Sequence, residues 1–127
     1  MFLLDTNVVI DMRDGNAKVL NAIAGLREDV ALSIMTRIEL EGGVYSLPAA
    51  AVIRRQRLDA ILDLTPVLDF DASAADAYRD IVKSVGFSRR KITDRMIAAH
   101  AISLDATLVT LNGADFADIP DLKLLAW

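Results

Sequence analysis

Short apolar runs alternate along the chain with longer segments in which apolar residues recur at helical spacing. The short runs predict five strands, the last of them at a sheet edge: Phe2–Leu4, Val30–Ile34, Val67–Phe70, Thr107–Thr110 and Lys123–Ala126. Helical segments separate most of these strands. Such alternation is typical of a mainly parallel sheet that is covered by helices on both faces.

Turn and capping residues set the limits of the predicted helices. The helix after Asp5 breaks at residues 14–16 (Asp-Gly-Asn), and a second helix precedes Val30. We expect four further helices: from Thr36 to about Gly43, between Pro48 and Leu64, from Ser73 to Val85, and from Thr93 to Leu104. The predicted fold class is therefore α/β, a single three-layer α/β/α domain over residues 1–127 with a mainly parallel sheet of four or five strands.

Carboxylates fall where such a fold places its ligands, beyond the carboxyl ends of the strands. Asp5 ends the first strand, Glu39 lies in the first turn of the helix after the second strand, and Asp115 lies just past the fourth strand. Asp94 opens the helix that leads into the fourth strand. It joins the others only if that helix begins at the same edge of the sheet.

Four carboxylates in one place need a counter-charge. Two ionised carboxylates about 4 Å apart repel by about 4 kcal/mol at an effective dielectric of about 20. The chain has no cysteine and one histidine, so its donors are oxygens, which favour the hard ions Mg²⁺ or Mn²⁺. One or two such ions would polarise a phosphoryl oxygen and activate water, which predicts a phosphodiester site.

Each carboxylate also has an explanation that requires no function. Asp5 could cap the helix that follows it. Thr36 and Glu39 match the capping box, and Thr93 is a suitable cap that would leave Asp94 at the positive end of its helix.

Two further residues have ordinary structural explanations. Asp115 could be a turn acid. His100 lies six residues after Asp94, off its helical face, and we expect it to be a surface or buried structural histidine rather than a catalytic one.

Charge and composition add limits. The formal net charge of −4 argues, taken alone, against a nucleic-acid-binding protein. The basic residues are nevertheless clustered, in one group of Arg54, Arg55 and Arg57 and another of Arg89, Arg90, Lys91 and Arg95. Each group could contact a phosphate backbone or be the solvated face of a helix. The lack of cysteine suits a cytoplasmic location, and we expect no signal peptide and no membrane-spanning helix.

Taken together, these segments resemble the PIN-domain family, and within it the VapC-type toxins of bacterial toxin–antitoxin pairs. The resemblance covers nearly the whole chain. Its carriers are Leu3-Leu4-Asp5-Thr6-Asn7, Thr36-x-x-Glu39-Leu40, Asp94-x-x-Ile97-Ala98-Ala99, Leu108-Val109-Thr110-x-Asn112-x-x-Asp115-Phe116, and Ile119-Pro120-x-Leu122 with a terminal Trp127.

The resemblance implies a PIN-like domain whose acids at positions 5, 39, 94 and 115 hold one or two Mg²⁺ or Mn²⁺ ions. It also implies that Thr6, Asn7, Thr110 and Asn112 support this site by hydrogen bonding. Family members cleave RNA, often a particular transfer or ribosomal RNA. They pair with a small antitoxin and usually form homodimers, so we expect an RNA substrate, a cognate antitoxin and a second copy of the chain as partners.

Three alternatives remain open at this stage. One is a PIN-like module that binds RNA or protein without cleaving. Another is an aspartate-based phosphohydrolase with Asp5 as nucleophile, although such enzymes commonly carry a second Asp two residues later, where this chain has Asn7. The third is an unrelated doubly wound domain whose acids are caps and turns. Residues 44–75 carry no family motif, and we expect the apolar stretch Tyr45–Ile53 to pack in the core rather than form an interface.

Overall fold

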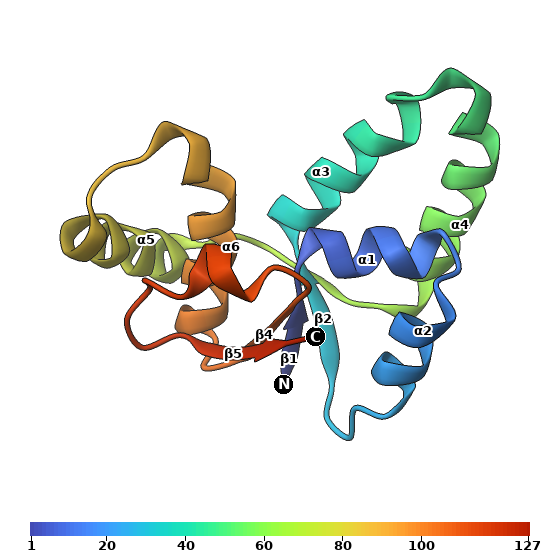
Figure 1. Cartoon of the computed structure of the whole chain (residues 1–127). Helices are drawn as coiled ribbons and strands as arrows, with labels where there is room; N and C mark the ends of the chain where they lie inside the picture. The colour runs from blue at the N-terminus through green and yellow to red at the C-terminus, as the bar shows by residue number, and fades with distance from the viewer.

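The computed structural model describes all residues 1–127 and contains one five-stranded sheet (Figure 1). The strands are β1 (Phe2–Leu4), β2 (Val30–Ser33), β3 (Val67–Leu68), β4 (Thr107–Thr110) and β5 (Lys123–Ala126). Their order across the sheet is β3-β2-β1-β4-β5, and every neighbouring pair is parallel. The predicted α/β fold is confirmed, and β5 is an edge strand as expected.

Six α-helices and three short 3₁₀ helices connect the strands. The α-helices are α1 (Thr6–Arg13), α2 (Ala17–Ala24), α3 (Ile34–Tyr45), α4 (Ala51–Leu64), α5 (Ala72–Val85) and α6 (Ile92–Ser103). The 3₁₀ helices are η1 (Pro48–Ala50), η2 (Arg89–Lys91) and η3 (Gly113–Phe116). None of the helices combines the length and the apolar run that crossing a bilayer would need.

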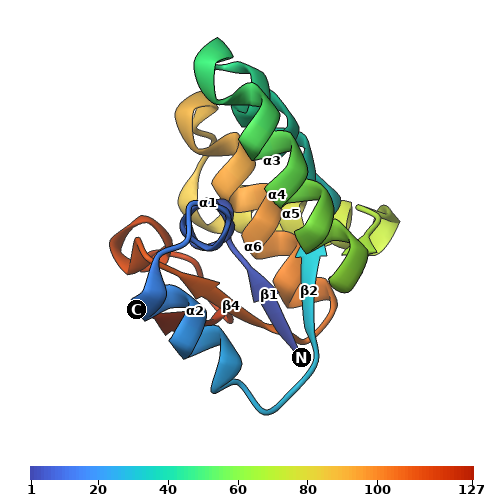
Figure 2. The same cartoon turned by 90° about the vertical axis from the view of Figure 1, so that its right-hand side faces the viewer.

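Two hydrophobic clusters, one on each face of the sheet, give the domain its three layers. Successive strand residues point to opposite faces. Leu3 and Leu108 therefore belong to the cluster with α5 and α6, whereas Leu4 and Val109 belong to the cluster with α1 to α4. Figure 2 shows α6 behind the sheet, on the side away from α2. All four of these side chains are fully buried.

The polypeptide passes from β2 into α3 without a loop. Ser33 is the last residue of β2 and the N-cap of α3, and its Oγ accepts the Met35 N–H at 3.1 Å. The same Oγ lies 2.8 Å from His100 Nδ1, a buried hydrogen bond that joins the start of α3 to α6. The predicted helix start at Thr36 is therefore two residues late, and Thr36 is buried inside the helix.

Helices α3 and α4 pack together as an arm that projects beyond the sheet (Figure 1). The expectation that Tyr45–Ile53 packs in the core is wrong. Tyr45 and Val52 are 63% and 73% exposed, and Leu47 and Ile53 are exposed as well. These side chains lie at the end of the arm, where no other element is available to cover them.

Replacing Ser33 with alanine is expected to lower the free energy of unfolding by about 1–3 kcal/mol. The change removes the N-cap of α3 and leaves His100 Nδ1 buried without its partner. Ser73→Ala is the control, since Ser73 is exposed on α5. Urea denaturation of both variants measures the effect, and equal stability of the two would contradict the assigned role of Ser33.

Candidate functional site

Asp5 lies at the carboxyl end of the central strand β1, with 4% of its surface exposed. Its backbone N–H donates to Val109 O at 2.8 Å, which extends the pairing of β1 with β4 by one residue. Its side chain is held by two donors. Thr6 N–H donates to Oδ1 at 2.8 Å, and Thr110 Oγ1 donates to Oδ2 at 2.8 Å. Asp5 therefore does cap α1, and it is also fixed at the sheet edge by β4.

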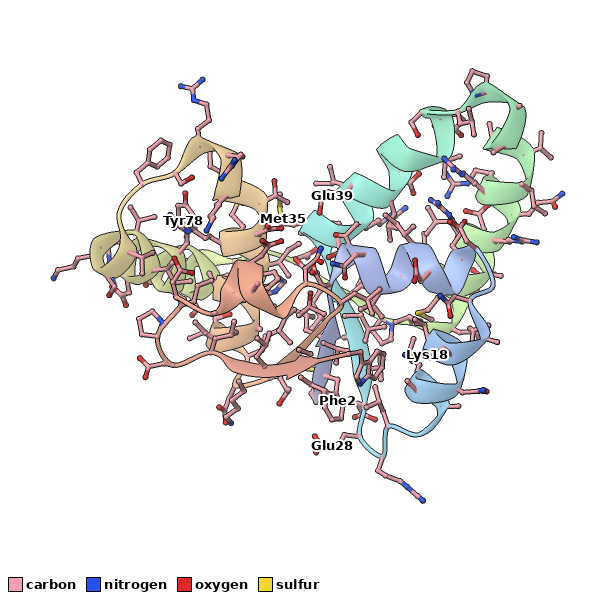
Figure 3. All side chains as sticks on the ribbon, viewed as in Figure 1. Phe2, Lys18, Glu28, Met35, Glu39 and Tyr78 are labelled. Atoms are coloured by element: carbon pink, nitrogen blue, oxygen red, sulfur yellow. The ribbon has the colours of Figure 1, made fainter.

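Glu39 comes to the same edge from α3. Thr6 Oγ1 donates to Glu39 Oε1 at 2.6 Å. Figure 3 shows Glu39 on α3, near the point where α1 begins. Because Ser33 rather than Thr36 caps α3, the capping-box explanation of Glu39 is wrong. Glu39 is exposed, and Thr6 links it to Asp5.

Asp94 and Asp115 approach from the other side of β1. Asp94 lies in the first turn of α6, whose N-cap residue, Lys91, makes no side-chain capping bond. Thr93 is thus inside the helix, and the prediction that it caps α6 is wrong. Asp115 lies in η3 and is exposed.

Electrostatic coupling places the four acids in one neighbourhood. Burial raises the pKa of Asp5 to about 6, against the opposing effect of its hydrogen bonds from Thr110 and Thr6, and the charges of Asp94 and Glu39 raise it further. Burial also raises the pKa of Asp94, and the charges of Asp115 and Glu39 add to that shift. Helix α6 therefore begins at the same edge of the sheet as the other three acids. Asp94 could be grouped with them only if this was so.

The chemistry of this donor set fits a hard divalent cation, since every side chain in it offers carboxylate oxygens. In this structure, however, no three side chains among His, Cys, Asp and Glu come close enough to hold a metal ion. Asp5 is fixed by two hydrogen bonds and Glu39 accepts one from Thr6, whereas Asp115 is exposed.

The polar residues named as supports differ in what they contact. Thr110 Oγ1 donates to Asp5 and accepts the backbone N–H of Asn112 at 3.0 Å. Asn7 Oδ1 accepts the Leu111 N–H at 3.2 Å, which ties α1 to the end of β4. Thr6 and Thr110 thus touch the acids directly. Asn7 fixes the backbone beside them, and Asn112 contributes its backbone amide to the hydroxyl that holds Asp5.

The basic residues near α6 do not form one surface. Arg89 and Arg90 are exposed on η2, and the charge of Lys91 partly opposes the rise in the pKa of Asp94 that burial causes. Arg95 is only 5% exposed. Its Nη1 donates to Gly86 O at 2.6 Å and its Nη2 lies 3.7 Å from Asp118 Oδ2. This burial speaks against the prediction that Arg95 contacts RNA.

In the other basic group, Arg54 and Arg55 are occupied within the α3–α4 arm, whereas Arg57 is exposed and its Nη1 donates to Arg13 O at 3.4 Å. Arg55 pairs with Glu41 and Asp59, both at 2.5 Å, and Arg54 Nη1 donates to Gly43 O at 2.8 Å. The contacts of Arg54 and Arg55 hold α3 and α4 together, so these two residues are better explained as structural.

His100 has a structural environment, as expected. It is 1% exposed, it bonds Ser33, and its ring meets Phe70 edge-on with centroids 5.5 Å apart. Burial lowers the pKa of His100, which favours the neutral ring. The role of Ser33 was missed from sequence, although a serine between an apolar run and a helix is a recognisable cap signal.

Comparison with known proteins matches the chain to the PIN domain family model over residues 2–122. Ribonuclease VapC2 from Rickettsia felis is 29% identical in an alignment that covers 100% of this chain and 98% of that protein.

Solved structures agree over almost the whole length. VapBC2 from Rickettsia felis, bound to a DNA fragment from its promoter, has a TM-score of 0.87 at 28% identity and covers 99% of this chain and 98% of that one. FitAcB from Neisseria gonorrhoeae has a TM-score of 0.80 at 33% identity and covers 98% and 96%.

Asp5→Asn is expected to change the pH dependence of stability. The folded-state pKa of about 6 lies above the ordinary value of 3.8, so the folded protein binds this proton more tightly than the unfolded chain. The stability that the proton contributes is complete below 3.8 and is lost as pH rises through about 6. The Asp5→Asn variant has no such proton to lose. Its free energy of unfolding should therefore rise relative to that of the parent, by up to about 3 kcal/mol, as the pH increases from 3.8 to above about 6.

Denaturant melts in a chelator-containing buffer at a series of pH values measure the difference between variant and parent. Asp63→Asn, a change at an exposed position on α4, should leave the profile unchanged. If the Asp5→Asn curve runs parallel to that of the parent, the raised pKa of Asp5 is contradicted.

Proposed function

The chain belongs to the PIN domain family, and from that premise we propose that it is an endoribonuclease that hydrolyses RNA phosphodiester bonds at Asp5, Glu39, Asp94 and Asp115. The observation that carries the proposal is the fixed position of Asp5 at the carboxyl end of the central strand, where Thr6 links it to Glu39 and where the charges of Asp94 and Glu39 help to raise its pKa. The likeness to a protein named a ribonuclease supports it, because that likeness extends over the full length of the chain.

Mg²⁺ or Mn²⁺ is the proposed cofactor, with the same carboxylates as its ligands. When bound, such an ion supplies positive charge that polarises the scissile phosphate. The protein's own contribution is orientation. Thr110 and Thr6 hold the two oxygens of Asp5, and the Thr6 hydroxyl turns Glu39 toward the same place. Asn7 and Asn112 keep the backbone beside them in position.

The surroundings of Asp5 count against an aspartate-based phosphohydrolase. Both of its carboxylate oxygens already accept hydrogen bonds, which lowers their nucleophilicity. The position two residues on is Asn7, whose side chain is bonded to the backbone of Leu111 and cannot serve as the second acid. Hydrolysis by water activated among the carboxylates agrees better with this arrangement.

The proposed biological role is that of the toxin of a VapBC-type pair, with a small antitoxin as partner and a homodimer as its assembly. Structures of similar fold from Rickettsia felis and Salmonella typhimurium are VapBC complexes bound to DNA. The exposed apolar side chains of the α3–α4 arm, which include Tyr45, Leu47 and Val52, offer a surface for such a protein partner. Arg89, Arg90 and Lys91 are the proposed RNA contacts.

Asp94→Asn is expected to reduce RNA cleavage by about 100-fold or more, because it removes a proposed metal ligand while the fold is retained or stabilised. The assay incubates purified protein with total RNA and Mg²⁺, with and without EDTA. Asp63→Asn is the matched control on the exposed face of α4 and should cleave at the parent rate. A folded Asp94→Asn variant with parent activity would remove Asp94 from the site.

Expression of the chain alone is expected to arrest bacterial growth, because uncontrolled RNA cleavage is toxic. The Asp94→Asn variant, expressed to the same level, should permit normal growth. Colony counts after induction measure the difference. Equal survival with the active and inactive chains would contradict the toxin role, while the cleavage assay would still stand as the test of the enzyme.

A further inference from the structure

The loop between α5 and α6 displays one aromatic side chain among cations. Phe87 is 65% exposed, and Arg89 and Arg90, which follow it on η2, are exposed as well. All the other large exposed apolar residues lie outside this loop: Leu20, Ile38, Tyr45, Leu47, Val52, Ile53 and Leu64. Phe87 is therefore an isolated aromatic in a basic setting, not part of an apolar patch of the kind that marks a protein interface.

The base of this loop is firmly held. Gly86 ends α5 with φ of 85°, a conformation that favours glycine, and its N–H donates to Val82 O at 2.8 Å. Its carbonyl accepts Arg95 Nη1 at 2.6 Å. Arg95 is buried, and its guanidinium also forms an ion pair with Asp118. Phe87 thus projects from a fixed position, which lowers the entropy cost of using it to bind.

The loop also borders the acidic site. Residues 89–91 run directly into α6, which carries Asp94 in its first turn. The charge of Lys91 acts on Asp94. In Figure 1 the loop, coloured yellow to orange, lies toward the end of the molecule to which β1 points, where Asp5 ends that strand. An RNA strand at the carboxylates would pass next to η2, the segment that directly follows the loop carrying Phe87.

We propose that Phe87 stacks on an unpaired base of the RNA while Arg89 and Arg90 contact the phosphates beside it. This inference rests on the proposed ribonuclease function. An aromatic face flanked by cations is the composition that binds single strands, because every base offers a face for stacking. In a duplex the bases are already stacked on one another and cannot take up such a contact.

The test measures binding of a short fluorescent single-stranded RNA of mixed sequence in the Asp94→Asn background with EDTA present, so that no cleavage intervenes. Phe87→Ala should weaken RNA binding about 10-fold or more, whereas Phe87→Trp should bind RNA as tightly as the parent does. Leu64→Ala, which truncates an 88% exposed side chain at the end of α4, is the control and should bind as the parent does.

Two further comparisons separate stacking from charge. Phe87→Ala should lower affinity by the same factor at every salt concentration, whereas Arg89→Gln with Arg90→Gln should reduce the slope of log affinity against log salt by about 1.4. An RNA that lacks bases at successive positions should bind the parent more weakly than the intact RNA does. The Phe87→Ala variant should bind the two RNAs with equal affinity.

The outcomes distinguish this inference from the function on which it rests. If the parent shows no EDTA-sensitive cleavage of RNA, the proposed function fails. If the parent cleaves but Phe87→Ala binds RNA as tightly as the parent, only the stacking proposal is overturned. A Phe87→Ala variant that keeps RNA affinity but loses self-association would instead assign the side chain to a contact between copies of the chain.

Discussion

A carboxylate held in the buried end of a central strand is unfavourable unless hydrogen bonds or a counter-charge offset the loss of solvation. Asp5 is in this position, between the ends of β2 and β4. Thr110 and Thr6 supply hydrogen bonds, yet burial still raises the pKa of Asp5 to about 6. The neighbouring acids make the cost larger. Positive charge at this edge would offset that cost, which is the physical reason to expect a cation there.

The elements around Asp5 are connected so that the other acids keep their places. Ser33 is the connection between β2 and α3, and its hydroxyl bonds His100 on α6. One buried contact thereby links the helix that carries Glu39 to the helix that carries Asp94. Arg95, one residue after Asp94, fixes both the end of α5 and the segment that follows η3. The protein therefore uses its buried polar groups to hold together the parts that border the acidic edge.

The strands and the position of Asp5 could be predicted from the sequence because apolar runs end abruptly at polar residues there. The starts of α3 and α6 could not, since Ser33 ends a strand and caps a helix at once, and α6 continues from η2 with no capping side chain. Both errors gave Glu39 and Asp94 capping explanations that depended on Thr36 and Thr93, which are not caps. Arg95 was grouped with Arg89, Arg90 and Lys91 as an RNA contact because the sequence does not show which of these side chains is buried. The exposure of Tyr45 and Val52 was missed for the same reason, because an apolar run looks alike in a core and on a projecting arm.

The claim that the four acids form one metal site is tested most directly by anomalous X-ray scattering from crystals of this chain grown with Mn²⁺. The account predicts anomalous peaks among the carboxylates of Asp5, Glu39, Asp94 and Asp115, with the exposed side chains of Glu39 and Asp115 rotated toward them. An anomalous map that shows no peak at this edge of the sheet, or that places Mn²⁺ only at other acids, would contradict it.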